Sequence, residues 1–211
     1  MTAAEPLEIR PVRSRADARR FRKLPTLLYG GDPAFVPPLD VAVAAVLDRR
    51  KNPSWRQARG VEGLARRGAR PVGRIGACRE EALFAATDGL GAVGFFDVAN
   101  DAEAATRLQQ TALDWLKAAG CRGARGPLNY SIHDSAGVLV DGFGTPPAVD
   151  TTWNPPYLVA FWEAAGWTGA QDMLAAAGDL EAGGPERARK LGRRAAARSG
   201  VGVRPLDLLS L

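Results

Sequence analysis

The sequence predicts an α/β fold, in which a single domain holds a mixed central sheet flanked by helices. Three observations predict it. Residues 61–65 and 72–77 form two strand-like segments joined by a glycine-containing turn, residues 91–98 form a largely apolar run, and a capped helical pattern follows that run directly. Strands that alternate with helices along a chain favour a sheet whose faces are covered by helices. The 211 residues suffice for one domain with a sizeable core.

The first fifty residues predict a strand and two helices. Residues 7–12 alternate apolar and polar side chains, as a strand does, and contain a proline that stops it. Ser14 and Asp17 have the spacing of a capping box, so we expect a helix to begin there and Pro25 to kink or restart it. Residues 41–47 predict a second, short helix.

The middle of the chain predicts the centre of the sheet. The two segments around residue 68 are expected to pair as a hairpin, and residues 91–98 to form a central strand. Asn100 is predicted to cap the next helix, and Glu103 can reach back to the cap. Apolar residues then recur every three or four positions until a glycine ends the pattern, which predicts a long amphipathic helix.

The last ninety residues predict four more elements. They are a strand over residues 121–127, a helix over 155–165, a strand over 172–176 and a basic helix over 186–199. A Gly-Gly-Pro sequence precedes the basic helix. We therefore expect the domain to cover residues 1–182, with residues 183–211 forming a C-terminal basic helix and a short extended tail.

Composition excludes several functional classes. No apolar stretch is long enough to cross a bilayer, and the N-terminal residues lead into no secretory signal, so we expect a cytoplasmic protein. Cys78 and Cys121 make no disulfide framework. One histidine and no Cys-x-x-Cys pair exclude the common zinc sites, so no metal is expected.

The net charge of +5 raises the question of nucleic acid binding. The basic residues fall in separate groups, no aromatic residues interleave with the last group, and no helix-turn-helix or zinc-finger pattern is present. We therefore expect a small-molecule substrate as the partner and neither nucleic acid nor a membrane, while a homodimer stays open.

Three stretches of sequence resemble one superfamily. Residues 70–75 read RPVGRI, residues 154–167 read NPPYLVAFWEAAGW, and residues 126–143 read GPLNYSIHDSAGVLVDGF. Together with the order of the elements, they resemble the GCN5-related N-acetyltransferase (GNAT) superfamily, and the last stretch resembles a little-characterised bacterial branch annotated only as N-acetyltransferase-like. The resemblance covers about residues 7–205 and implies a GNAT-like domain whose fourth and fifth strands splay apart. Since longer members of the branch exist, a missing second half is one alternative.

The resemblance implies an acyl-CoA-dependent N-acyltransferase acting on a small amine-containing metabolite. Acetyl-CoA or another acyl-CoA would lie between the splayed strands, with its pyrophosphate at the N-terminus of the following helix, where free N–H groups and the helix dipole favour anions. The positions that correspond to cofactor-binding residues are Phe96, Asp97, Val98, Asn100 and Arg107.

The resemblance also implies a carboxylate, or a water that it holds, as base and a tyrosine as proton donor. Tyr157 is the candidate donor. Asp134 and His133 are the candidate bases, because only there does the single histidine meet a carboxylate. For His133, an ordinary loop residue that makes a hydrogen bond is the favoured alternative, because adjacent residues in an extended segment point opposite ways. The candidate substrate-binding residues are Asn129, Tyr130, Ser131 and Asn154. Alternatively, Asn129, Ser131 and Asp134 hold the loop through hydrogen bonds to the backbone.

The turn expected to hold the pyrophosphate departs from the superfamily pattern. Residues 98–105 contain no glycine and place Asp101 and Glu103 where phosphates would lie. Acidic side chains are the normal complement of a helix N-terminus that binds no anion. Two alternatives to acyl transfer therefore stay open: an enzyme of another reaction type that reuses the cleft without CoA, and a non-catalytic binding domain.

One further pattern has two interpretations. Four aromatic residues near the late helix are expected in the core, although they could also line an apolar pocket: Trp153, Phe161, Trp162 and Trp167.

Overall fold

The structure is a computed structural model that describes residues 5–131, 134–149, 151–176, 185–200 and 202. The chain forms two compact units, residues 1–170 and 171–211, and each is described by itself. The first unit contains the sheet, and the second contains the basic helix near the C-terminus. The predicted boundary at residue 183 lies outside the described residues.

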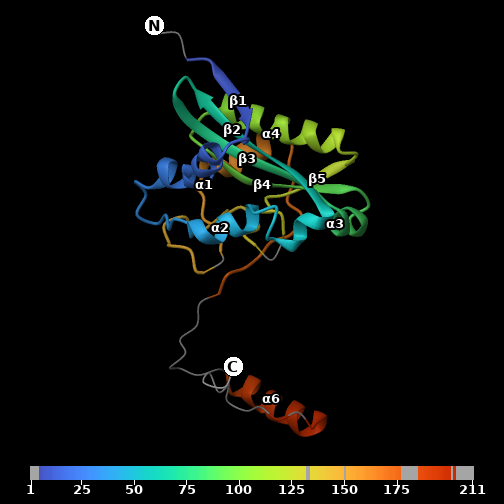
Figure 1. Cartoon of the computed structure of the whole chain (residues 1–211). Coiled ribbons are helices and arrows are strands. Elements are labelled where there is room, and N and C mark those ends of the chain that lie inside the picture. Colours follow the sequence, from blue (N-terminus) through green and yellow to red (C-terminus); the bar gives the residue numbers. More distant parts are fainter. Residues whose placement is uncertain (1–4, 132–133, 150, 177–184, 201, 203–211) are drawn as a thin grey trace. The chain divides into compact units, whose positions relative to one another are not determined.

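The first unit is built on a five-stranded sheet whose strands lie side by side in chain order (Figure 1). The first four strands run antiparallel to their neighbours, while the fifth pairs in parallel with the fourth. The predicted α/β class with a mixed central sheet is therefore confirmed. The strands are β1 (Leu7–Pro11), β2 (Ala58–Arg67), β3 (Arg70–Glu80), β4 (Leu90–Val98) and β5 (Gly123–Arg125).

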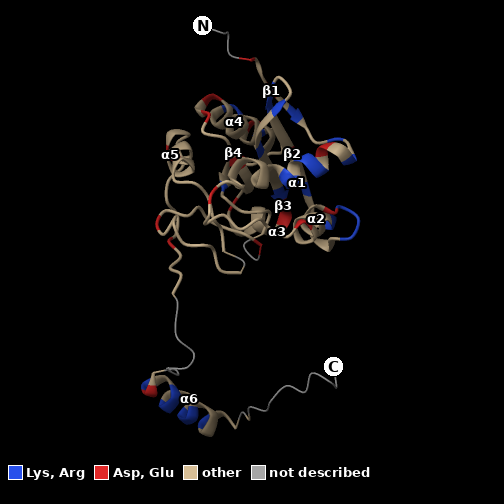
Figure 2. Cartoon of the chain, turned by 90° about the vertical axis from the view of Figure 1, so that its left-hand side faces the viewer, with Lys and Arg blue, Asp and Glu red and all other residues tan. Residues whose placement is uncertain are grey.

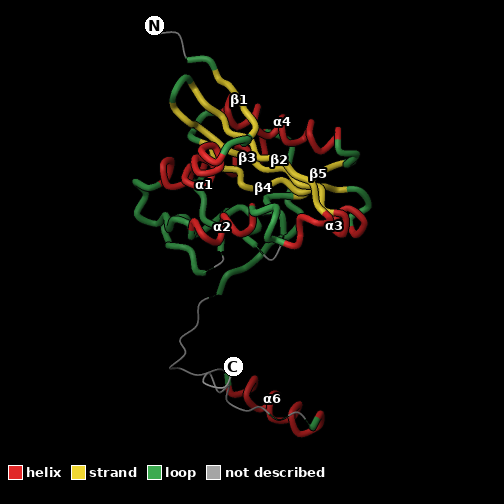
Figure 3. Tube along the Cα trace, in the orientation of Figure 1, coloured by secondary structure: helices red, strands yellow, loops and turns green. Residues whose placement is uncertain are grey.

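Helices cover both faces of this sheet (Figure 3). Leu64 of β2 packs with Phe21 of α1, whereas its neighbour Ala65 belongs to the core that contains Leu108 of α4. Successive strand residues point to opposite faces, so α1 and α4 lie on opposite sides of the sheet. The helices of this unit are α1 (Arg15–Tyr29), α2 (Asp40–Leu47), the 3₁₀ helix η1 (Pro53–Gln57), α3 (Glu81–Ala86), α4 (Ala102–Ala118) and α5 (Tyr157–Ala164).

The pairing of β4 with β5 is short, so the two strands separate early. Only three residues of each strand pair, and the chain beyond β5 then follows β4 through the bond from the Leu128 N–H to the Val93 carbonyl (2.8 Å). At Phe95, whose φ is 48°, β4 is irregular, and its N–H donates to the Asn129 side chain (2.7 Å). The last residues of β4 therefore form no ladder with β5, which agrees with the prediction that these two strands splay apart.

Local signals in the sequence start the helices as expected, with one correction. The Asp17 N–H donates to Ser14 Oγ (3.1 Å), and α1 then runs on through Pro25 to its last residue. The prediction that Asn100 caps α4 is wrong by one residue. Asp101 is the cap, because its extended backbone directs its carboxylate to the Ala104 N–H (3.1 Å).

The predicted strand over residues 172–176 is not formed. Its two large apolar side chains, Met173 and Leu174, are 68% and 96% exposed. A strand is stabilised by burying apolar side chains against its neighbours, and this segment buries neither of its two. The apolar pattern alone therefore gave a wrong prediction here. Further along the second unit, the predicted basic helix is formed as α6 (Glu186–Ser199).

A buried arginine joins three elements of the first unit. Arg74 of β3 is 4% exposed, and its Nε donates to the Asp97 carboxylate of β4 (2.7 Å). Its Nη1 donates to the Phe21 carbonyl of α1 (2.8 Å), and the guanidinium lies over the rings of Phe21 and Phe95. Each charged group is thus paired, which its burial requires.

Replacing this arginine with an apolar residue of similar length will destabilise the domain. In Arg74→Met, Asp97 is left without its countercharge and the Phe21 carbonyl without its donor, so we expect the free energy of unfolding to fall by about 3 kcal/mol. Urea denaturation followed by tryptophan fluorescence measures this. The matched control is Arg20→Met, because the Arg20–Asp17 pair is exposed and its loss should leave the midpoint unchanged. Equal midpoints for both variants would contradict this account of Arg74.

Candidate functional site

The end of β4 is held by two tyrosines from distant helices. Tyr29, the last residue of α1, accepts from the Val98 N–H (3.0 Å) and lies within donating distance of the Val98 carbonyl (3.3 Å). Tyr157, the first residue of α5, donates to the same carbonyl (2.9 Å). These bonds to the backbone of one residue bring α1 and α5 together at the C-terminal end of β4.

Burial, together with the nearby carboxylate of Asp97, keeps both tyrosines protonated. Burial raises the pKa of Tyr157 to about 12, and the negative charge of Asp97 adds to the rise while a hydrogen bond with Tyr29 opposes it. Burial, and then Asp97, raise the pKa of Tyr29 far above its ordinary value. Both hydroxyl groups therefore carry their protons at neutral pH and can act as proton donors.

Aromatic side chains close this region. Phe96 is buried against Trp162 of α5 with ring centroids 5.1 Å apart, and Trp162 packs edge-on against Trp167 at 4.6 Å. On the other side, Trp153 packs against both Tyr29 and Phe35. The four aromatic residues near the late helix all belong to or pack on the main core, which agrees with the expected core role.

The N-terminus of α4 is neutralised by the chain itself. Arg67 of β2 donates through Nε and Nη2 to the two Asp101 oxygens (2.6 and 3.0 Å) and through Nη2 to Glu103 (2.7 Å). These bonds raise the pKa of Arg67, and the hydrogen bond from Arg67 is the main cause that lowers the pKa of Asp101. Arg107, a predicted cofactor-binding residue, donates to the Leu7 carbonyl (3.1 Å). The helix end thus carries a carboxylate and a guanidinium where a phosphate was predicted.

The loop after β5 is fixed by its polar side chains. The Asn129 side chain accepts from the Phe95 N–H. Tyr130 has a backbone φ of 72°, and its hydroxyl donates to the Glu62 carboxylate of β2 (3.0 Å). The Asp134 N–H donates to the Ser131 carbonyl (3.2 Å). His133 lies outside the described residues.

The predicted substrate-binding asparagine before α5 also holds the chain. Asn154 is 8% exposed, accepts from the Leu139 N–H (2.7 Å), and donates to the Leu139 and Pro155 carbonyls (3.2 and 3.1 Å). Asn154 thus uses its polar atoms for internal bonds. Asn129 does the same, as in the alternative in which it holds the loop through bonds to the backbone.

The predicted site residues therefore fall into three places. Phe96, Asp97, Val98 and Tyr157 meet at the end of β4, and Asn100 and Arg107 lie at the start of α4. The other described candidates, Asn129, Tyr130, Ser131, Asp134 and Asn154, lie in loops. The sequence prediction missed Tyr29, Arg67 and Arg74. Arg67 and Arg74 fall in one basic group of the sequence, and Arg74 also lies in the RPVGRI stretch. Their partners depend on the register of the strands and the packing of the helices, which the sequence does not show.

We also looked for places that could hold a ligand or a metal ion. A cavity of about 220 Å³ lies between β1, β2, β3 and α4, and its lining is mostly apolar, for example Ile9, Val61 and Ile75. Among the described residues, no three His, Cys, Asp or Glu side chains are grouped so that they could hold a metal ion.

Comparison with known proteins finds relatives of greater length. No protein-family profile matches the chain. The chain is 36% identical over 204 residues to the bacterial ceramide synthase of Caulobacter vibrioides (strain NA1000 / CB15N), a match that covers 96% of this chain and 53% of that protein. It is 30% identical over 169 residues to protein YghO of Escherichia coli (strain K12), covering 79% of this chain and 43% of that protein. The chain spans about half the length of the curated relatives it matches.

Similar solved structures include two acetyltransferases. An aminoglycoside acetyltransferase from an uncultured soil metagenomic sample is 11% identical, with a TM-score of 0.47, and the match covers 82% of this chain and 96% of that one. Glucosamine-6-phosphate N-acetyltransferase from Arabidopsis thaliana is 13% identical, also with a TM-score of 0.47, and the match covers 83% and 100%.

The ion pair at the start of α4 makes stability depend on pH. Because the pKa of Asp101 is lower in the folded chain than its unfolded value near 3.9, the pair stabilises the fold above about pH 5 and is lost as the pH falls through the folded pKa. In Asp101→Asn the side chain can still cap α4 but carries no charge. We expect a lower urea midpoint than wild type at neutral pH and the same midpoint near about pH 2.

The control is Asp114→Asn, an exposed carboxylate on the same helix that accepts from Gln110 (2.8 Å). Its midpoint should follow wild type at every pH. A constant difference between Asp101→Asn and wild type across the range would contradict the assignment to the ion pair.

Proposed function

We propose that this chain carries the acyl-transfer centre of an N-acyltransferase that moves an acyl group from acyl-CoA to the nitrogen of a long-chain amine. The 36% identity with bacterial ceramide synthase, which extends over 96% of this chain, carries the proposal. A ceramide is the fatty acyl amide of a long-chain amino alcohol, so its synthesis forms an amide at an amine nitrogen. The proposed acceptor is longer than the small amine that we expect from the sequence. A cytoplasmic location stays a prediction.

The end of β4 offers a proton donor for such a transfer. The amine nitrogen attacks the thioester carbonyl, the C–N bond forms, and the C–S bond breaks. The leaving thiolate takes up one proton, and the nitrogen gives one up. Tyr157 is protonated at neutral pH, lies at the open end of β4, and is proposed to donate to the thiolate. Asp134 remains the proposed proton acceptor.

A specific observation favours a second candidate function. Asp101, Glu103 and Arg67 occupy the place at the start of α4 where a pyrophosphate would lie. A pyrophosphate at that position would meet two carboxylates, unless Arg67 left them to pair with it. The second candidate is therefore a domain that binds or transforms a metabolite without CoA.

Removing the Tyr157 hydroxyl tests the first candidate. The full chain is incubated with palmitoyl-CoA and a long-chain amino alcohol, while thiol release and amide formation are measured. We expect Tyr157→Phe to lower kcat about a hundredfold or more, as loss of a proton donor does. Tyr29→Phe is the matched comparison, because it removes a hydroxyl from the same carbonyl; we expect it to lower stability, and to lower kcat much less than Tyr157→Phe does. Equal kcat values for wild type and Tyr157→Phe would contradict the role of Tyr157.

Removing the acids at α4 separates the two candidates. Asp101→Asn with Glu103→Gln frees Arg67 to bind phosphate, so we expect calorimetry to show CoA binding about tenfold more tightly than wild type. Asp114→Asn again serves as the control, with unchanged affinity. Unchanged affinity in the double variant places the pyrophosphate away from α4, and no heat with either protein favours the second candidate.

A further inference from the structure

Helix α2 is apolar on every side and lies on the surface. Its eight residues read DVAVAAVL, and none of them is buried. Val41 is 74% exposed, and Leu39, which precedes the helix, is 73% exposed. An ordinary surface helix buries one apolar stripe and shows a polar face to water. Helix α2 packs Val43, Val46 and Leu47 against the core that contains Phe21 and Leu24, but its outer side carries Val41 and two exposed alanines in place of polar residues. This outer side therefore has the character of a contact surface.

The exposed apolar surface continues onto α1 and the segment that joins the two helices. Leu27 of α1 is 64% exposed, and Val36 in the connection is 52% exposed. Leu27 follows Arg19 and Lys23 at intervals of four residues, so the three side chains form one stripe along α1. This stripe carries cations at one end and a leucine at the other.

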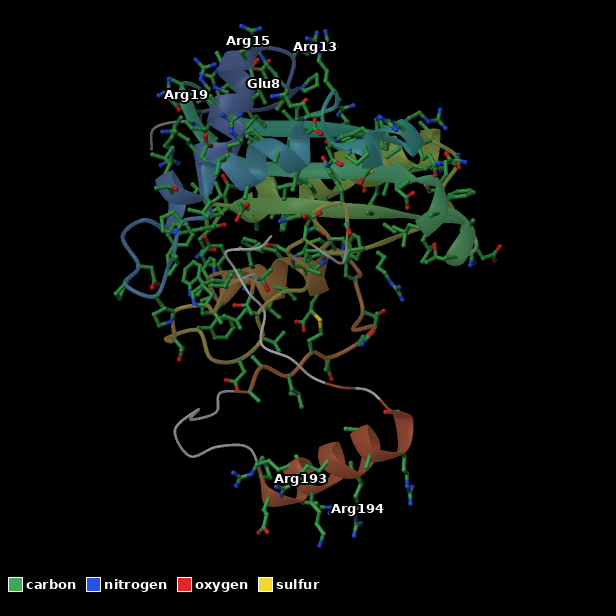
Figure 4. All side chains as sticks on the ribbon, turned by 60° about the horizontal axis from the view of Figure 1, so that its bottom comes forward. Glu8, Arg13, Arg15, Arg19, Arg193 and Arg194 are labelled. Carbon is green, nitrogen blue, oxygen red and sulfur yellow. The ribbon has the colours of Figure 1, made fainter. Side chains whose placement is uncertain are left out.

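Cationic side chains flank α2 at both ends. At its start, Arg22 pairs with Asp40 (2.8 Å), and the positive charges of Lys23 and Arg19 also act on Asp40. At its end follow Arg49, Arg50 and Lys51, in the basic loop beside α2 in Figure 2. Figure 4 shows Arg13, Arg15 and Arg19 pointing outward around the first turns of α1.

The acidic groups near α2 are fewer than the cations. Asp40 pairs with Arg22, which leaves Arg19 and Lys23 in excess at the start of the helix. The Asp48 carboxylate accepts from the N–H groups of Arg50 and Lys51 (2.9 and 3.2 Å) and keeps its negative charge, so it offsets one of the cations at the end of the helix. The net character of the surface is apolar at its centre and cationic at its rim.

We propose that this surface docks on an anionic phospholipid membrane. The docking face consists of Leu27, Val36, Leu39 and Val41 with Arg19, Lys23, Arg50 and Lys51. Apolar side chains that enter the interfacial region, with Lys and Arg at the headgroups, are the pattern of proteins that lie on a bilayer. Nucleic acid would use the cations but gains nothing from four exposed aliphatic side chains.

The docking face does not require a membrane-spanning helix. In the part of the chain that is described, no helix has the length and hydropathy to cross a bilayer. The inference departs from the expectation of no membrane partner, which considered spanning segments and basic groups but not an apolar surface beside them. It stands on the surface alone and not on the proposed acyl transfer, although a long-chain amine would be met at such a membrane.

Vesicle flotation tests the proposal without any measure of activity. The full chain is mixed with vesicles of phosphatidylcholine, either alone or with phosphatidylglycerol, and the bound fraction is measured. We expect binding only to the anionic vesicles, weakened by added salt. Equal binding to both vesicle types, or none to either, would overturn the proposal.

Two variants separate the apolar and cationic parts of the docking face. Leu39→Gln with Val41→Gln, and Arg19→Glu with Lys23→Glu, should each weaken vesicle binding about tenfold or more. The matched controls are Val149→Gln, which changes an apolar side chain that is 91% exposed, and Lys117→Glu with Arg125→Glu, which reverses two exposed cations on α4 and β5. Controls that bind like wild type support the proposal, whereas controls as weak as the variants overturn it.

Two further measurements address the competing explanations. Arg193→Glu with Arg194→Glu alters α6 in the second unit, and loss of vesicle binding in this variant alone would overturn the docking face. Binding to a DNA duplex is measured in parallel. If Arg19→Glu with Lys23→Glu weakens binding to the duplex but not to vesicles, the surface serves nucleic acid and the proposal fails. Circular dichroism melts confirm that every variant is folded.

Discussion

The arrangement of the domain depends on the contacts of the Arg74 guanidinium. It holds the Asp97 carboxylate at the end of β4 and the carbonyl of Phe21 in the middle of α1. Two turns further along α1 lies Tyr29, whose hydroxyl meets the Val98 peptide. A buried ion pair is weak support for stability by itself, but it fixes position because breaking it is costly. The position of Tyr29 is therefore set by a contact that lies eight residues away.

Elements with local signals were predictable, and contacts that depend on register were not. Ser14 caps α1 as its spacing indicates, because a cap involves only the next few residues. The pairing of Arg67 with Asp101 joins residues that are 34 positions apart, and only the docking of β2 beside the start of α4 brings them together. The failed strand at 172–176 shows the converse, since an apolar pattern without burial does not make a strand.

The polar loop residues show why candidate sites are difficult to assign from sequence. Asn129 and Asn154 have side chains suited to binding a substrate, but a long loop packed on a sheet also has backbone groups that need partners. The structure uses these side chains for that need. The same residue types therefore signal either role, whereas Tyr157 was a candidate from the resemblance and is found with its hydroxyl at the end of β4.

The shared carbonyl of Val98 has a consequence for proton transfer. A carbonyl oxygen has two lone pairs, and here the hydroxyl groups of Tyr29 and Tyr157 both approach the same oxygen, that of Val98. If the Tyr157 hydroxyl turns toward another acceptor, Tyr29 still satisfies the oxygen, and no buried polar atom is left without a partner. The protein thus keeps a spare donor in place, so that one hydroxyl is free to move at little cost while the strand end stays fixed.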